Sequence, residues 1–371
     1  MRNKVLLIGF SLSKDSFGGV DNYNKLLTNN FRSKKLELNY FSIGNSLNWS
    51  NSNIKNSKFK YILNHFTTAL DLAKKVKSEK IDLVHINSTF SFFDLFRFSL
   101  FSFFAKLSGA KSLLFVRGWH ETTYLRIESN FLLKNVFKYL MSLYSFFLVL
   151  SKEYKVKLGS IIKMDKIGLS SVMVDKNIFN NNTTLSSRIN NLLFCGSLFK
   201  TKGVYEMLES FLISIKSNKK LKLIIMGDGP ERRNMVDFCI SNNINDKVLF
   251  LGHVQGEIKA SFFSSCGILL LPSYREGFPN VVVEALSSGM VVISTKVGAV
   301  NDVIKQGKNG FLISSNPPEV GEISSIISEI TNDKSRFSKI CNANLLLSEN
   351  FSVSKVCKEI EDYYEITITN K

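Results

Sequence analysis

Residues 273–289, SYREGFPNVVVEALSSG, contain the groups best suited to chemistry on an anion. They follow an apolar run, Ile268 to Leu271, which predicts a buried strand that Pro272 closes. A polar turn then leads through Pro279 into an apolar-rich helix, and proline suits a first helical turn because the N–H it lacks would be unpaired there. The free N–H groups and positive dipole end of such a helix can bind an anion.

Two carboxylates flank this helix start, because Glu276 lies in the turn and Glu284 lies inside the helix. With about five intervening helical residues at ~1.5 Å each, they are separated by roughly 7 Å plus the turn. One carboxylate could then reach the sugar of a nucleotide-sugar and the other its ribose, with the diphosphate over the helix start. The alternative is a surface helix with two solvated glutamates, and the stretch alone does not decide between them.

Two other turns between a strand and a helix carry groups that suit phosphate. Lys200 and Lys202 precede a predicted helix at residues 204–215, where they could bind a diphosphate as point charges. Gly18 and Gly19 lie between a first strand and a helix, and there their backbone N–H groups could closely approach a phosphate or sugar. Solvated lysine pairs and Gly-Gly turns are both common, so each signal is weak by itself.

Arg117 and His120 follow a predicted strand at residues 112–116. Open α/β sheets bind ligands at the carboxyl ends of their strands, so both side chains could meet phosphate, donor sugar or an acceptor hydroxyl. In the alternative interpretation Arg117 pairs with Glu121 and Trp119 packs against its neighbours.

The composition describes a globular chain with a basic surface. The 371 residues are 44% hydrophobic and carry a formal net charge of +17, which favours anionic partners such as phosphorylated substrates or acidic lipid. The chain is also rich in Lys, Asn, Ser, Ile and Phe, a bias that can raise lysine content without function. No nucleic-acid-binding motif is present, so nucleic acid is not an expected partner.

Cysteine and histidine spacing predicts no metal site. The five cysteines are far apart and odd in number, which argues against a disulfide framework and fits a reducing cytoplasm. The start of the chain has no signal-peptide pattern, and charges interrupt every long apolar window. We therefore expect a cytoplasmic protein.

Residues 90–107 are heavily aromatic, and their phenylalanines spread around the expected helix rather than forming one stripe. Part of this helix is expected in the core. An exposed fraction, together with Lys134, Lys138 and the net charge, would favour contact with the inner face of the cytoplasmic membrane or a lipid-tailed acceptor.

Alternating strands and helices occur in two series, separated by a composition shift near residues 170–187 that includes a polar linker at 180–184. The expected fold class is α/β, with two Rossmann-like doubly wound domains facing across a cleft. The expected boundaries are 1–172, which would bind the acceptor, 173–350, which would bind the donor, and 351–371, a helix that returns to the first domain.

The second half of the chain resembles the donor-binding domain of glycosyltransferase family 4, the retaining enzymes of the GT-B fold. The resemblance is good over residues 190–315 and looser in the first half. It rests on the order and spacing of six motifs: EGFPNVVVEAL with Glu276 and Glu284, the turn Gly196 to Gly203, GDGP at 227–230, Gly298-Ala299 with Asp302, Gly18-Gly19-Val20, and Val174-Asp175 with Phe179 in the segment that joins the domains.

The resemblance implies roles for these residues and the absence of an essential metal or other cofactor. Glu276 would contact donor-sugar hydroxyls, Glu284 the ribose, and Lys202 the diphosphate, while residues near Val254 would line the base. Backbone groups would bind sugar and phosphate along the stretch Gly277, Phe278, Pro279 and Asn280. Gly18 and Gly19 would approach the phosphate, and Glu276, Arg117 and His120 are the catalytic candidates.

Two positions depart from the family pattern. The diphosphate-binding arginine is replaced by Ser197, a neutral donor for which Lys200 or Arg117 could compensate. The family's His-Gly element reads Arg117-Gly118, with His120 two residues later, so which of these residues takes the histidine role stays open.

The resemblance predicts transfer of a sugar from a UDP- or GDP-linked donor to a glycan acceptor. The aromatic helices favour a lipid-linked oligosaccharide and therefore assembly of cell-surface polysaccharide such as capsule or O-antigen. The alternatives are a GT-B nucleotide-sugar epimerase, a non-catalytic basic module, and an inactive partner of another transferase. Intact Glu276, Glu284 and Lys202 argue against the last of these.

Overall fold

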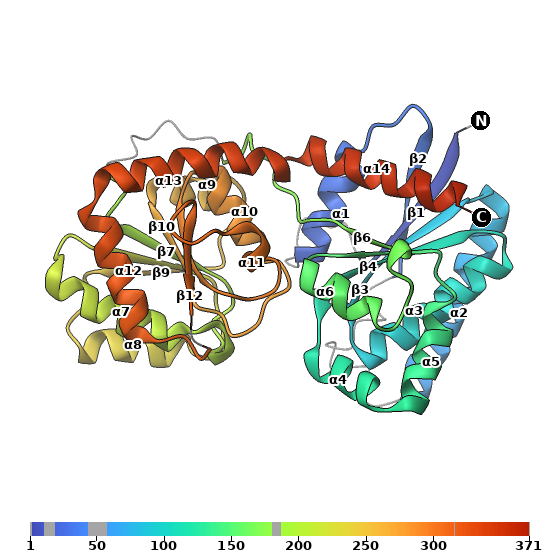
Figure 1. Ribbon diagram of the computed structural model, residues 1–371, viewed down its shortest axis with the longest axis horizontal. Helices are drawn as coiled ribbons and strands as arrows, with labels where there is room; N and C mark the ends of the chain where they lie inside the picture. The colour runs from blue at the N-terminus through green and yellow to red at the C-terminus, as the bar shows by residue number, and fades with distance from the viewer. Residues whose placement is uncertain (1, 11–18, 44–57, 180–186, 315, 371) are drawn as a thin grey trace. The chain divides into compact units, whose positions relative to one another are not determined.

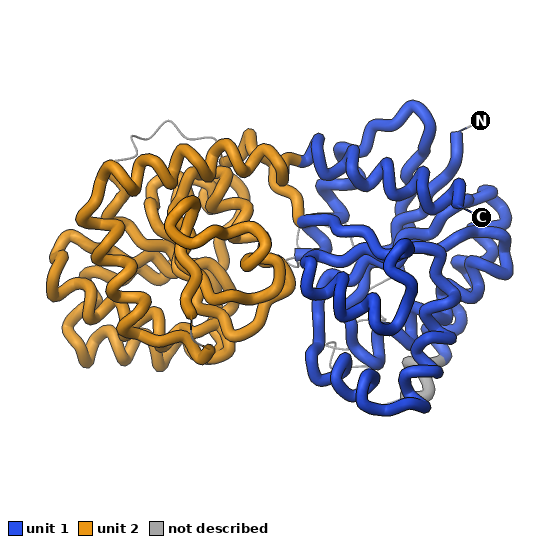
Figure 2. The backbone as a smooth tube through the Cα atoms, viewed as in Figure 1, with its two compact units in different colours: residues 1–171, 353–371 blue, residues 172–352 orange. Residues whose placement is uncertain are grey.

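The computed structural model describes residues 2–10, 19–43, 58–179, 187–314 and 316–370. The chain forms two compact units (Figures 1 and 2). Unit 1 contains residues 1–171 and 353–371, and unit 2 contains residues 172–352. The boundaries expected from the sequence lie within two residues of these divisions. The predicted linker at residues 180–184 lies outside the described residues.

Unit 1 is built on a six-stranded parallel sheet in the order β2-β1-β3-β4-β5-β6. Its strands are β1 (Asn3–Gly9), β2 (Leu36–Ser42), β3 (Leu83–Phe90), β4 (Lys111–Trp119), β5 (Phe146–Val149) and β6 (Ile167–Leu169). Its helices are α1 (Gly19–Asn30), α2 (Lys58–Glu79), α3 (Phe92–Leu107), α4 (Glu121–Ser129), α5 (Phe131–Met141), α6 (Lys152–Gly159), the 3-10 turn η2 (Met164–Lys166) and α14 (Val353–Thr369).

Unit 2 has a second six-stranded parallel sheet, in the order β12-β11-β10-β7-β8-β9. Its strands are β7 (Asn191–Cys195), β8 (Lys222–Met226), β9 (Val248–Gly252), β10 (Ile268–Leu271), β11 (Val291–Thr295) and β12 (Gly310–Ile313). Its helices are η4 (Lys200–Lys202), α7 (Val204–Ser217), α8 (Arg232–Ser241), α9 (Gly256–Ser265), α10 (Asn280–Ser287), α11 (Val300–Val303), α12 (Val320–Asn332), α13 (Lys334–Leu347) and η5 (Ser348–Phe351).

The sequence explains why these sheets are covered on both faces. Their strands are short continuous apolar runs rather than alternating patterns, as parallel strands between helical layers require. Each unit has its own apolar core, which includes Leu114 and Phe147 in unit 1 and Leu270 and Ile293 in unit 2. The predicted pair of doubly wound sheets is therefore present.

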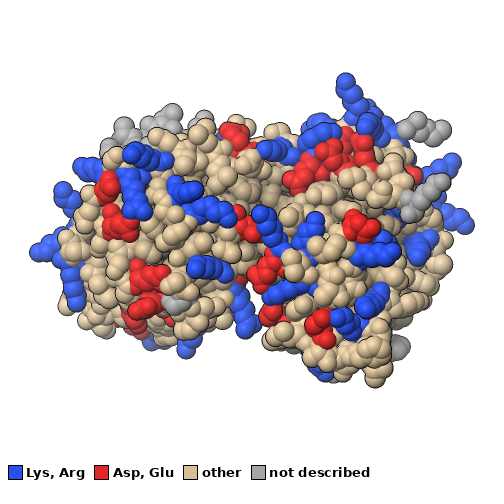
Figure 3. All heavy atoms as spheres, viewed as in Figure 1, with Lys and Arg blue, Asp and Glu red and all other residues tan. Residues whose placement is uncertain are grey.

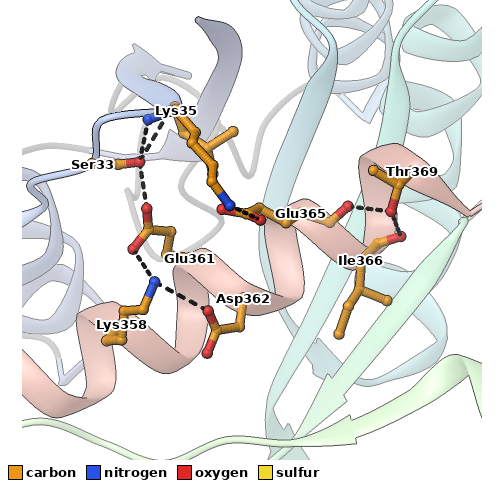
Figure 4. A network of polar contacts seen from close by, with 9 residues as sticks. Ser33, Lys35, Lys358, Glu361, Asp362, Glu365, Ile366 and Thr369 are labelled. Carbon is orange, nitrogen blue, oxygen red and sulfur yellow. Dashed lines mark hydrogen bonds and ion pairs between the residues drawn. The ribbon is translucent and has the colours of Figure 1, made fainter.

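Helix α14 follows unit 2 in the sequence but packs on unit 1, where it contacts α1, β3 and β4. Polar contacts join it to the segment before β2, because Glu361 accepts a hydrogen bond from Ser33 and Glu365 pairs with Lys35 at 2.7 Å (Figure 4). Within α14, Lys358 pairs with Glu361 at 2.8 Å. Its buried side adds Ile360 and Tyr364 to the interior of unit 1.

Charge of both signs is spread over each unit on the face that Figure 3 shows, where Lys and Arg alternate with Asp and Glu. The net charge of +17 is therefore not gathered into one basic patch on that face.

Candidate active site

The candidate site of unit 2 lies where the order of its strands reverses, between β7 and β10. The connections after these two central strands run in opposite directions, so a crevice opens beyond their carboxyl ends, and there open α/β sheets bind ligands. The turn after β7 carries Ser197 and Lys202, and the turn after β10 carries Glu276. The topology thus brings together residues that are about eighty positions apart in the sequence.

Lys202 and Glu276 form an ion pair at this edge, with 2.6 Å between Nζ and Oε1. Both side chains are mostly buried, the carboxylate more than the ammonium. A lysine ammonium has three donors, so Lys202 can keep Glu276 and still donate to a phosphate oxygen. The pair therefore presents a cation and a hydrogen-bond acceptor side by side.

Two glycines allow the loops around this pair to pack backbone against backbone. Gly203 has φ +69°, and a Cβ there would lie 2.0 Å from the carbonyl oxygen of Pro272. Gly298 has φ +47°, and a Cβ there would lie 1.9 Å from the carbonyl oxygen of Gly277. The N–H of Ala299 donates to that same Gly277 oxygen at 2.8 Å, so the loop after β11 holds the turn that carries Glu276.

Helix α10 begins at Asn280, one residue later than the sequence suggested, because Pro279 has extended backbone and forms the N-cap. The side chain of Phe278 is buried and packs edge-to-face on Phe351, with 5.7 Å between ring centroids. The buried Phe278 side chain thus fixes the position of the turn. The backbone N–H groups of Gly277 to Asn280 are the groups of this turn that suit contact with a ligand.

Glu284 has a partner that the sequence did not reveal. Lys259 of α9 donates to its Oε1 at 2.7 Å and lies 2.7 Å from Oε2. The ammonium is thus equally close to both carboxylate oxygens, and Glu284 is held as a buried ion pair. Burial lowers the pKa of Lys259, but the Glu284 carboxylate outweighs this effect and the pKa is raised overall. The Lys259 ammonium is therefore charged at neutral pH.

Two of the other predicted donor-binding residues occupy loops of unit 2. Ser197 is exposed between β7 and η4, and Val254 is half-buried between β9 and α9. In unit 1, Gly19 is the exposed first residue of α1, whereas Gly18 lies outside the described residues. The roles of these residues in binding a donor remain predictions.

Arg117 was expected after the fourth strand but lies inside it, because β4 continues to Trp119. The pairing with β3 shifts register after Ser88 and resumes with Thr89 opposite Gly118 and Phe90 opposite Trp119. The Trp119 ring is sandwiched between Phe90 and Tyr154, with centroid distances of 4.3 and 4.7 Å. This stacking explains why the strand extends beyond the apolar run.

Arg117 does not pair with Glu121, so that part of the alternative is wrong, whereas the expected packing of Trp119 is confirmed. Glu121 instead accepts hydrogen bonds from Trp119 Nε1 at 3.0 Å and from Lys157 at 2.8 Å. The Arg117 side chain is 9% exposed and lies over the ring of Tyr23. His120 is the exposed N-cap residue of α4 and makes no side-chain capping hydrogen bond.

The aromatic helix of unit 1 has two sides, as the sequence suggested. In α3, Phe98 and Phe101 are buried in the core, whereas Phe93 and Phe96 are exposed. The neighbouring helices α2 and α5 expose further apolar residues. The exposed apolar face of unit 1 comprises Leu63, Phe66, Leu70, Phe93, Phe96, Phe103, Leu107, Phe131, Leu132, Val136 and Tyr139.

Two further observations concern metals and membranes. The described residues contain no group of three or more His, Cys, Asp or Glu side chains arranged to bind a metal ion. Among the same residues, no helix is both long and apolar enough to span a bilayer.

Comparison with known proteins agrees with this geometry. The sequence model of the family described as glycosyl transferases group 1 matches residues 175–344, nearly the whole of unit 2. The chain is 27% identical over 234 residues to the capsular polysaccharide biosynthesis glycosyltransferase CapM of Staphylococcus aureus, which covers 58% of this chain and 59% of CapM. The chain thus aligns with less than two thirds of that relative.

Solved structures resemble the whole chain. A glycosyltransferase from Rickettsia africae matches with a TM-score of 0.75 at 17% identity, covering 100% of both chains. HepE of Anabaena, crystallised with UDP, matches with a TM-score of 0.73 at 15% identity, covering 98% of this chain and 100% of HepE. These matches confirm the predicted GT-B fold class.

Residues 175–344 are thus similar in sequence to glycosyl transferases group 1, and the whole chain has the GT-B fold.

Proposed function

We propose that this protein is a retaining glycosyltransferase of family 4 that transfers a sugar from a UDP- or GDP-linked donor to a glycan acceptor. The observation that carries the proposal is the pair of carboxylates at one sheet edge, each with its own lysine: Glu276 with Lys202 and Glu284 with Lys259. This arrangement suits a ligand that has hydroxyls at both ends and negative charge between them.

In the proposed reaction the bond between the anomeric carbon and the diphosphate oxygen breaks, and a bond to the acceptor oxygen forms. The acceptor proton leaves with the nucleoside diphosphate. Lys202 and the N–H groups at the start of α10 stabilise the negative charge that develops on the leaving group. Glu276 orients the donor sugar, and Glu284 accepts from a ribose hydroxyl. No metal takes part in this proposal.

Support for UDP as the donor nucleotide comes from HepE, whose crystals contain UDP. The name of CapM supports a place in the synthesis of capsular polysaccharide. A lipid-linked oligosaccharide as acceptor is proposed from the exposed aromatic residues of unit 1.

The exposed apolar face of unit 1 supports a peripheral position on the inner surface of the cytoplasmic membrane. Phe131 and Leu132 of α5 are 76% and 74% exposed, and Lys138 of the same helix is also exposed. A helix with apolar residues and lysines exposed together suits an anionic lipid surface.

The proposed donor is tested by thermal unfolding with UDP, GDP and a panel of UDP- and GDP-sugars, followed by incubation of the stabilising donor with and without lipid-linked acceptors. We expect one nucleotide family to raise the midpoint and calorimetry to show weaker diphosphate binding in Lys202→Met. Binding of no nucleotide would refute the proposal. A new sugar formed from donor alone would identify an epimerase instead.

The membrane position is tested by co-sedimentation with anionic phospholipid vesicles. The double variant Phe131→Glu and Leu132→Glu should lose binding. The matched control Leu346→Glu alters a leucine of unit 2 that is also 76% exposed, and it should bind as the wild type does. Equal binding by all three proteins would exclude this face as the membrane contact.

A further inference from the structure

Arg117 is a buried cation without a described counter-charge. Its guanidinium carbon lies 3.9 Å from the centroid of the Tyr23 ring and 4.9 Å from that of Phe115. Among the residues that the structure describes, no carboxylate forms an ion pair with it, and its Nη1 is buried without a hydrogen-bond partner. Burial lowers the pKa of Arg117 to about 10, so the side chain is still charged at neutral pH.

The titratable neighbours of Arg117 are neutral and do not balance its charge. Burial raises the pKa of Tyr23 well above its usual value, and the Tyr23 hydroxyl also has no described hydrogen-bond partner. Burial, with a contribution from Arg117, lowers the pKa of His85 to about 3, so this histidine is uncharged at pH 7. The surroundings therefore carry one uncompensated positive charge, which is costly unless something binds it.

The position of Arg117 resembles that of the unit 2 site. The strand order of unit 1 reverses between β1 and β3, and Arg117 lies on β4, next to β3 and near its carboxyl end. At the same end, Asn87 of β3 donates to Asn24 of α1 at 2.9 Å, so polar side chains replace the apolar core there. Ligands of open α/β sheets bind at this edge.

A second buried arginine shows what a structural role looks like in this chain. Arg188 of unit 2 is 1% exposed and donates to the carbonyl oxygens of Ser288 at 2.7 Å and Gly289 at 3.2 Å. Its terminal nitrogens thus satisfy the end of α10. Arg117 satisfies no such group among the described residues, and a guanidinium donor without an acceptor is suited to bind an oxyanion.

We propose that Arg117 binds an anionic oxygen group, a carboxylate or a phosphate, of the substrate held by unit 1. This inference deepens the proposed function. It rests on that function in one respect, because the proposed function identifies the ligand of unit 1 as the acceptor. The acceptor is then an acidic molecule, and Arg117 recognises its charge through two parallel hydrogen bonds rather than acting on the reacting hydroxyl.

The test uses the full chain in phosphate-free buffer at constant ionic strength and measures the thermal midpoint with inorganic phosphate, with glucuronate and with neutral glucose. We expect a saturable rise with at least one anion and none with glucose. In Arg117→Met the anion response should fall at least tenfold, and Arg117→Lys should retain part of it because lysine lacks the planar fork. A phosphate response identifies a phosphate ester, and a glucuronate response identifies an acidic sugar.

Arg126→Met is the matched control, because Arg126 is an exposed arginine of unit 1 that also lies over an aromatic ring, that of Phe92. This variant should respond as the wild type does, and phosphate bound at Lys202 contributes equally to every protein. Without anion, the midpoint of Arg117→Met should equal or exceed that of the wild type, because a buried unpaired charge has been removed.

Two results would overturn the proposal. One is an equal anion response in Arg117→Met and the wild type. The other is a lower midpoint of Arg117→Met in anion-free buffer, which would make Arg117 a structural residue. Neither result bears on donor binding by unit 2, which the nucleotide screen measures separately.

Discussion

The two units treat buried charge differently. In unit 2, Glu276, Glu284 and Arg188 each have a partner of opposite charge or a set of carbonyl acceptors. In unit 1, Arg117 has neither among the described residues. A satisfied charge can belong to the fold, to the ligand or to both, whereas an unsatisfied charge costs stability and points to a ligand.

This difference separates the two kinds of specificity that a transferase needs. The proposed donor side is organised before a ligand arrives, because Lys202 and Lys259 already hold the two carboxylates. The unit 1 side would be completed by the charge of its own substrate. Four changes would break or sharpen this comparison.

The largest expected effect is on catalysis. Glu276→Gln keeps the size of the side chain but removes its charge, and we expect transfer to fall on the order of 100-fold to 1000-fold while the fold is preserved. Donor consumption and circular dichroism measure the two quantities. Glu257→Gln, an exposed glutamate of α9, is the control. Near-normal turnover of Glu276→Gln would remove this residue from the active site.

Arg188→Met tests whether the buried arginine of unit 2 is structural. The change leaves the carbonyl oxygens of Ser288 and Gly289 without their donor, so we expect unfolding to become easier by about 2–3 kcal/mol. Chemical denaturation measures the change, with the exposed Arg233→Met as control. If Arg188→Met and Arg117→Met affected stability equally, the contrast between the two arginines would disappear.

Lys259→Met tests the pair at Glu284. It leaves the buried carboxylate without its ammonium, and because Lys259 is partly exposed we expect a loss of about 1–2 kcal/mol, with weaker nucleotide binding. Lys259→Arg keeps the charge and should recover most of both. Since the folded-state pKa of Lys259 is raised, the stabilisation is complete below pH 10.5 and is lost only as pH rises through that higher value. A Lys259→Met protein as stable as the wild type would show that this pair is dispensable.

His85 gives the smallest effect and a pH dependence of known sign. Its pKa is about 3 in the folded protein, whereas the ordinary value of 6.5 applies to the unfolded chain. Between pH 3 and pH 6.5 the unfolded chain therefore binds a proton that the folded protein does not bind. Stability should therefore fall as pH decreases below 6.5, by about 1 kcal/mol per pH unit. His85→Gln should reduce the difference between the urea midpoints measured at pH 7 and at pH 5. His253→Gln, which changes an exposed histidine, should leave this difference unchanged. The same dependence of the urea midpoint on pH in all three proteins would show that the pKa of His85 is not lowered by its buried surroundings.

Much of the scaffold could be predicted because it depends on local patterns. Apolar runs bounded by Gly or Pro predict the strands, and the topology rule for open sheets places Glu276 and Lys202 at the same edge. Their contact at 2.6 Å follows from two turns that meet at one switch point.

What could not be predicted depends on packing between distant elements. Lys259 reaches Glu284 from another helix, and nothing in the sequence near either residue indicates the pair. The extension of β4 through Arg117 depends on Trp119 stacking against Phe90 of β3 and Tyr154 of α6. Spacing within β4 suggested a loop there, because the polar residues that follow Val116 do not resemble a buried strand.

Helix α14 has a consequence for the order of events during synthesis. The hydroxyl of Tyr364 is hydrogen-bonded to His85 Nδ1 at 2.6 Å, and Lys111 Nζ donates to the carbonyl oxygen of Ile368 at 2.9 Å. Residues 353–371 therefore complete the interior of unit 1, yet the ribosome makes them after residues 172–352. Unit 2 is contiguous and can fold first, while unit 1 waits for its closing helix with one apolar face uncovered. The residues of unit 1 that precede unit 2 thus cannot complete their packing until helix α14 has been made.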